Sequence, residues 1–155
     1  MVKKPPTPPG ENSGCDILHV EDDQDDRMLT REALQDLGFT GGLVEAKDGD
    51  EALRLLRTLP GSRMPALVLL DINLPKLRGH EVLQAIRADA KTKRIPVVML
   101  TSSDSEADVS RSYDLGANGY VVKPVGFESF SKAIESLAAF WLKVNRRPLA
   151  AVEAP

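Results

Sequence analysis

The sequence has little of several things that mark particular classes of protein. It contains a single cysteine, Cys15, so no internal disulfide can form, and a solitary thiol is typical of a reducing compartment. Only seven of the 155 residues are aromatic. Twenty Lys and Arg against 23 Asp and Glu give a formal charge of -3, without a long basic run. We therefore expect no nucleic-acid partner.

Long apolar runs and repeats are also missing. No stretch approaches the roughly 18 consecutive apolar residues of a membrane span, and the start, MVKKPPTPPG, is charged but has no apolar signal-peptide core. We expect a cytoplasmic protein with no membrane contact. The two ends, 1–14 and 148–155, contain many prolines and no periodic apolar pattern, so we expect two tails around one domain at 15–147.

Within 15–147, short apolar runs alternate with amphipathic stretches. The pattern predicts strands at 17–20, 43–46, 66–70, 97–100 and 119–122, and helices at 25–37, 49–58, 79–88, 105–115 and 126–144. The runs ALVLL, PVVML and GYVVK are nearly continuous in large apolar residues, which is typical of parallel strands buried on both faces. Strict alternation of strand and helix predicts an α/β fold with a doubly wound, five-stranded parallel sheet and five helices.

The residues that follow the expected strands carry the chemistry, because doubly wound sheets bind ligands beyond the carboxyl ends of their strands. The first strand is followed by Glu21 and Asp22, and the third by Asp71. Adjacent carboxylates repel and are costly to desolvate unless a cation joins them. Ligands that are all oxygen favour Mg²⁺ or Mn²⁺ over zinc. Thr101 and Lys123, at the ends of the last two strands, would converge on the same rim.

Four other polar residues have simpler interpretations. We expect Asp25 and Asp26 only to complement the dipole of the first helix at its N-terminus. His19 lies inside a strand, and we expect a core residue with a local hydrogen bond. His80 is expected to be an exposed surface histidine.

The order of these motifs resembles the receiver domain of two-component response regulators. The matching pieces are E-D-D, L-L-D-I-N-L-P-x-x-x-G, L-T-S and Y-V-V-K-P, and the resemblance covers residues 16–145. Each piece alone is weak, whereas the combination is highly specific. The resemblance implies a flavodoxin-like sheet of order 2-1-3-4-5 and a sensor histidine kinase as partner. It also implies that the chain is not an enzyme beyond catalysing its own phosphorylation and dephosphorylation.

The resemblance implies roles for four residues around a metal ion. Asp71 would be the phosphoacceptor, and Asp22 would bind Mg²⁺ directly. Glu21 would assist through water, and the backbone carbonyl of Asn73 would complete the ligands.

It also implies roles near the last two strands. Thr101 and Lys123 would contact phosphoryl oxygens, and Tyr120 would be an aromatic rotamer switch. The Lys123–Pro124 bond would be cis, which costs little before proline. Arg78 departs from the family, which often has a small polar or acidic residue there, and this difference would affect partner contacts and leave the chemistry unchanged.

The end of the sequence bears on the output. Ten residues follow Asn145, so we expect no effector domain and an output through protein–protein contacts. In the last helix LAAFWL is apolar all round, beyond the core face of Phe130, Ile134, Leu137 and Trp141. We expect a homodimer with Phe140 and Trp141 at its centre; the alternative is that Phe140 packs under the tail. FWLKVNRRP also resembles the end of phytochrome-associated response regulators, which implies a phytochrome as the kinase.

Four alternative functions remain open at this point. A phosphorelay intermediate or a phosphate sink would share the site. An aspartyl phosphohydrolase is less favoured, because D-I-N lacks a second acid two residues on. A flavodoxin-like binding module is also less favoured, because no glycine-rich loop follows the first strand.

Overall fold

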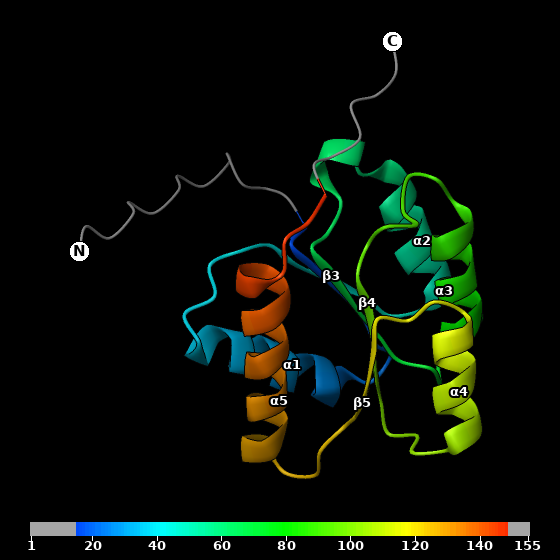
Figure 1. Cartoon of the computed structure of the whole chain (residues 1–155). Helices are drawn as coiled ribbons and strands as arrows, with labels where there is room; N and C mark the ends of the chain where they lie inside the picture. Colours follow the sequence, from blue (N-terminus) through cyan, green and yellow to red (C-terminus); the bar gives the residue numbers. More distant parts are fainter. Residues whose placement is uncertain (1–14, 149–155) are drawn as a thin grey trace.

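The computed structural model describes residues 15–148. A five-stranded parallel sheet lies between two layers of helices (Figure 1). The strands are β1 (Ile17–Val20), β2 (Leu43–Ala46), β3 (Leu67–Leu70), β4 (Val97–Thr101) and β5 (Gly119–Val122), and the α-helices are α1 (Gln24–Asp36), α2 (Gly49–Thr58), α3 (Gly79–Ala88), α4 (Glu106–Asp114) and α5 (Phe127–Ala139). The strand order is β2-β1-β3-β4-β5, which confirms the predicted fold.

Each face of the sheet has its own apolar core. Figure 1 shows α1 and α5 on one side and α2, α3 and α4 on the other. Val68 and Leu70 of β3 pack with the helices α2 and α3, whereas Leu67 and Leu69 pack with α1 and α5. Successive residues of a strand point to opposite faces, so a strand covered on both faces must be apolar at every position. The continuous apolar runs of the sequence follow from this geometry.

The last helix ends earlier than predicted. α5 stops at Ala139, and Phe140–Val144 (η2) forms one wider π-helical turn, in which the amide of Asn145 donates to the carbonyl of Phe140 at 2.7 Å. Periodicity alone cannot distinguish such a turn from continued α-helix, because the spacing of apolar residues changes little over one turn. Beyond this turn, the Arg147 guanidinium donates to the carbonyl of Met64 at 2.7 Å.

The start of α3 lies unusually close to the end of β3. Gly79 donates its amide to the carbonyl of Ile72 at 2.8 Å. A Cβ at Gly79 would lie 2.1 Å from the carbonyl oxygen of Asp71. Only glycine permits this approach, which ties the first turn of α3 to the residue that follows β3.

Three further expectations differ from the structure, the last of them only in part. Among the described residues no peptide bond is cis, so Lys123–Pro124 is trans; the trans form is the lower in energy by about 0.5–1 kcal/mol even before proline. His80 is buried, with only 7% of its surface exposed, because Ser112, 32 residues later, meets it with a hydrogen bond. His19 is a core residue as expected, but its Nδ1 has no hydrogen-bond partner.

The predicted tails at 1–14 and 148–155 lie outside the described residues, except for Pro148. In the described part of the chain, none of the helices is both long enough and apolar enough to cross a membrane.

Candidate functional site

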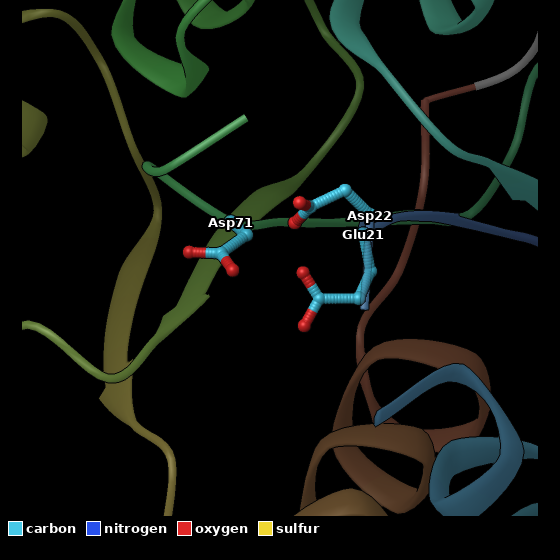
Figure 2. A group of neighbouring side chains, drawn as sticks. All are labelled: Glu21, Asp22 and Asp71. Atoms are coloured by element: carbon cyan, nitrogen blue, oxygen red, sulfur yellow. The ribbon is translucent and has the colours of Figure 1, made fainter. Parts of the chain in front are cut away.

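Three carboxylates meet at the carboxyl ends of β1 and β3. β1 and β3 are parallel neighbours with Val20 paired to Leu70, so Glu21 and Asp71, the next residue of each strand, lie side by side. One oxygen from each of Glu21, Asp22 and Asp71 lies within 4.8 Å of the others, and Figure 2 shows the three carboxylates gathered in one region. Glu21 has no exposed surface and Asp71 has 6%, whereas Asp22 is exposed.

Lys123, which follows β5, brings a positive charge to this cluster. Its ammonium donates hydrogen bonds to Asp26 at 2.8 Å, to Asp71 at 3.0 Å and to Glu21. The side chain is 10% exposed, so these contacts are largely shielded from water. A single cation therefore faces three carboxylates directly.

Asp26 belongs to this site, which corrects the expectation that it only complements the α1 dipole. Asp23 is the N-cap of α1 and accepts from the amides of Asp25 and Asp26. The carboxylate of Asp26 reaches Lys123, whereas Asp25 is exposed. No local pattern in the sequence distinguishes Asp26 from Asp25 in this respect, because the helix dipole accounts for both.

The carboxyl groups of the site differ in their affinity for protons. Burial raises the pKa of Glu21 to about 9, and the neighbouring Asp71 adds to this rise. Burial opposes the charged form of Asp71 as well, but Glu21, the Lys123 charge and the Thr101 hydroxyl together lower its pKa. Without a bound metal ion, the surroundings therefore favour the ionised form of Asp71 more than that of Glu21. Asp71 is thus the more nucleophilic of the two.

The site residues fit a divalent cation. All the candidate ligands are carboxylate or carbonyl oxygens, which suit hard cations. Oε2 of Glu21 is buried without a hydrogen-bond partner, and such an atom is satisfied by a cation. The amide of Asn73 donates to Oδ1 of Asp71 at 3.3 Å, so the backbone of this loop is folded around the carboxylate. Arg78 donates to the side chain of Asn73 at 3.2 Å at the rim of the site.

Thr101 and Tyr120 lie on the other side of Asp71. Thr101 is the last residue of β4 and is fully buried. Its Oγ1 accepts from the amide of Ser103 at 3.4 Å. Tyr120 of β5 is partly buried, and its hydroxyl donates to the carbonyl of Ser103 at 2.8 Å. Both residues therefore contact the same short segment after β4.

The two aromatic residues expected at a dimer interface lie away from the acidic site, in the turn that follows α5. The rings of Phe140 and Trp141 meet edge to face, with centroids 4.9 Å apart. Trp141 packs in part against the α1–α5 core, whereas Phe140 is 47% exposed. The predicted core face is confirmed for Phe130 and Ile134, and Ala138 is buried beside them.

The sequence matches one protein family and many individual proteins. Residues 17–135 match the family described as the response regulator receiver domain. The chain is 42% identical over 134 residues to the probable methanogenesis regulatory protein FilR2 of Methanothrix harundinacea, covering 85% of this chain and 86% of FilR2. It is 39% identical over 137 residues to response regulator Rcp1 of Synechocystis, covering 86% of this chain and 93% of Rcp1.

Solved structures agree with these matches. The structure resembles that of the phosphorylated cyanobacterial phytochrome response regulator RcpA with a TM-score of 0.80 and 38% identity, over 85% of this chain and 96% of RcpA. It resembles the Mn²⁺-bound form of Rcp1 with a TM-score of 0.77 and 38% identity, over 85% of this chain and 97% of that one.

Proposed function

Because the chain belongs to the family of response regulator receiver domains, we propose that it accepts a phosphoryl group from a sensor histidine kinase on Asp71. The phosphorylated protein then signals through changed protein–protein contacts. The observation that carries the proposal is the environment of Asp71, an ionised, nearly buried carboxylate within 3.0 Å of the Lys123 ammonium and beside Glu21 and Asp22.

The transfer needs a nucleophile and groups that stabilise charge. An oxygen of Asp71 forms a bond to phosphorus while the bond from phosphorus to the donor's imidazole nitrogen breaks, and the imidazole leaves with the electron pair. Lys123 neutralises one phosphoryl oxygen, and the Thr101 hydroxyl donates to another. The resulting mixed anhydride is labile, so the signal can be reset.

A divalent cation completes the charge balance. We assign Glu21, Asp22, Asp71 and the backbone carbonyl of Asn73 as the residues that hold it. Mg²⁺ supplies neutralisation of the phosphoryl oxygens when it is bound. The Mn²⁺-bound Rcp1 structure supports a site of this kind, and the all-oxygen donor set suits Mg²⁺.

A phytochrome is the kinase we propose, because RcpA is a phytochrome response regulator and its structure resembles this one over 96% of its own length. FilR2, described as a probable methanogenesis regulatory protein, is comparably similar to this chain. The kinase is therefore identified by measuring the transfer of radiolabel to this protein from each of a panel of the host's histidine kinases. The receiver domain would span 15–147 and act in the cytoplasm, where the free, buried Cys15 thiol would stay reduced.

A homodimer is the form we propose for the output. The half-exposed Phe140 and the adjacent Trp141 supply the kind of aromatic anchor that dominates such interfaces. Pairing of the same face on two subunits would cover both.

The function is tested by mass spectrometry after incubation with a small phosphodonor and Mg²⁺. We expect one added phosphoryl group on the wild-type protein, and none on Asp71→Asn or when a chelator is present. Asp36→Asn is the matched control, because Asp36 is an exposed aspartate at the far end of α1. Labelling that survives in Asp71→Asn would overturn the assignment.

A further inference from the structure

α4 is held in place by polar contacts and buries little apolar surface. Within Glu106–Asp114, all of which the structure describes, the one buried residue is Ser112. By contrast, the neighbouring helix α3 buries Val82, Leu83 and Ile86. Apolar burial is the main term that fixes a helix against a sheet. The position of α4 therefore depends on its hydrogen bonds, and such an element is displaced at low cost.

Ser112 is bound to His80 of α3. The hydroxyl of Ser112 donates its single proton to the carbonyl of Asp108 at 2.7 Å. The 2.9 Å contact between Nε2 of His80 and Oγ of Ser112 must therefore have the histidine as donor. This assigns a proton to Nε2 of His80. Both residues are buried, so the bond is made without competition from water.

His80 is also tied to the phosphoryl site through the backbone. It directly follows Gly79, whose amide donates to the carbonyl of Ile72 and whose Cα lies against the carbonyl of Asp71. The segment that carries His80 cannot shift without moving the backbone of Asp71. The hydrogen bond to Ser112 thus joins α4 to the phosphoacceptor loop.

A second set of contacts ties α4 to Thr101. The amide of Ser103 donates to the Thr101 hydroxyl oxygen at 3.4 Å, and the Ser103 hydroxyl donates to the Asp108 carboxylate of α4 at 2.6 Å. A phosphoryl group on Asp71 that takes a hydrogen bond from Thr101 would shift this segment and pull on α4. The hydrogen bond between His80 of α3 and Ser112 would resist that pull.

We propose that His80 is a positioning residue that holds α4 in its resting place through Ser112, so that loss of this hydrogen bond favours the phosphorylated arrangement. The proposal rests on the proposed function, because a resting and a phosphorylated arrangement exist only if Asp71 accepts phosphate. His80 touches none of the reacting atoms and acts through its hydrogen bond to α4.

The test is the affinity of the full chain for beryllofluoride with Mg²⁺, a phosphoryl analogue, measured by NMR titration of backbone amides. A contact made only in the resting state opposes binding, so its removal should tighten binding. We expect Ser112→Ala and His80→Leu to bind about fivefold more tightly than wild type, the effect of one buried hydrogen bond. His80→Gln keeps an N–H donor and should stay within about twofold of wild type. Ser110→Ala, an exposed serine of α4, is the matched control.

If the hydrogen bond between His80 and Ser112 had a purely structural role, Ser112→Ala and His80→Leu would lower the free energy of unfolding but leave the affinity for beryllofluoride unchanged. Unchanged or weaker binding of beryllofluoride by Ser112→Ala therefore overturns the proposal. The same conclusion follows if His80→Gln behaves like His80→Leu. If the wild-type protein itself fails to bind beryllofluoride, the proposed function fails instead. The amide spectrum of each variant shows whether it is folded, and Ser112→Ala removes only one oxygen atom.

Discussion

The ammonium group of Lys123 lies 3.0 Å from Oδ2 of Asp71, although 52 residues separate them in the chain. The contact exists because β3 and β5 are parallel and only β4 lies between them, so the residues that follow the two strands emerge at the same end of the sheet. Burial would lower the pKa of Lys123, but its hydrogen bonds to Asp26 and Glu21 raise it, so the charge is permanent at physiological pH.

Lys123→Ala should separate metal binding from the response. The variant leaves a cluster of carboxylates without its cation, so we expect the free energy of unfolding to fall by about 3 kcal/mol. Added Mg²⁺ should restore part of this loss, because Lys123 is not a proposed ligand. Phosphorylation should no longer change self-association. Urea denaturation with and without Mg²⁺ measures the loss of stability and its recovery, and Lys132→Ala, which removes an exposed lysine, is the control. If phosphorylation of Lys123→Ala still changed its self-association as in the wild type, Lys123 would have no part in the response.

Asp26→Asn should weaken Mg²⁺ binding about fivefold, because it removes a negative charge from the cluster and frees Lys123 to compete for Asp71. Asp25→Asn is the matched control, because Asp25 is adjacent to Asp26 and exposed. The Asp25→Asn variant should bind Mg²⁺ with the affinity of the wild type. Calorimetric titration with Mg²⁺ distinguishes the two. Equal affinities for the two variants would return Asp26 to the role of a helix N-terminal charge.

Gly79→Ala should disturb the loop that carries Asp71. A Cβ there would lie 2.1 Å from the Asp71 carbonyl oxygen, so backbone must move. We expect a loss of about 2 kcal/mol in the free energy of unfolding, with slower phosphorylation of Asp71. At Gly61 a Cβ meets nothing within 4 Å, so Gly61→Ala should be close to neutral. If Gly79→Ala were as stable as the wild type, the backbone around Asp71 would be able to accommodate a Cβ at residue 79 at little cost.

Phe140→Ala should shift the protein toward monomer. Truncation of an aromatic anchor typically costs ~2 kcal/mol, which raises the dissociation constant about thirtyfold. Phosphorylation of Asp71 should be unaffected, because Phe140 lies outside the acidic cluster. Phe127→Ala, also a half-exposed phenylalanine but at the other end of α5, is the control in analytical ultracentrifugation. A wild-type protein that is monomeric at tens of micromolar, with and without phosphodonor, would refute the dimer.

The stability of the protein should depend on pH through His80. Burial lowers the pKa of His80, aided by the charges of Arg111 and Arg78 and opposed by Asp108. Below the ordinary histidine pKa of 6.5, His80 takes up a proton in the unfolded chain, whereas its lowered pKa in the folded protein opposes protonation. The contribution of His80 is therefore fully present above pH 6.5 and is lost as the pH falls through the lower folded pKa.

Urea denaturation of the wild type and His80→Gln between pH 7.5 and pH 5.5 measures this contribution. His80→Gln should lose less stability over the interval. Burial also lowers the pKa of His19, to about 4, but His19 is present in both proteins, so its effect cancels in the comparison. Parallel pH profiles would show that His80 titrates normally in the folded state.

The sequence by itself determined most of the fold. Three of the five strands and two of the five α-helices of the described chain have the predicted bounds, among them β1 (Ile17–Val20) and α3 (Gly79–Ala88). Burial on both faces forces a continuous apolar run in the central strands, and this signal is local. The meeting of Glu21, Asp22 and Asp71 was predictable for the same reason, since parallel strands end at one edge of a sheet.

Only the tertiary structure decided which polar side chains meet across the chain. Asp26 and Lys123 are 97 residues apart, and His80 and Ser112 are 32 apart, so no local pattern pairs them. The helix dipole explains an acidic residue at the start of α1 equally well whether it faces solvent or the sheet. Burial of His80 depends on a serine presented by another helix. These contacts follow from how the helices pack, which local periodicity does not encode.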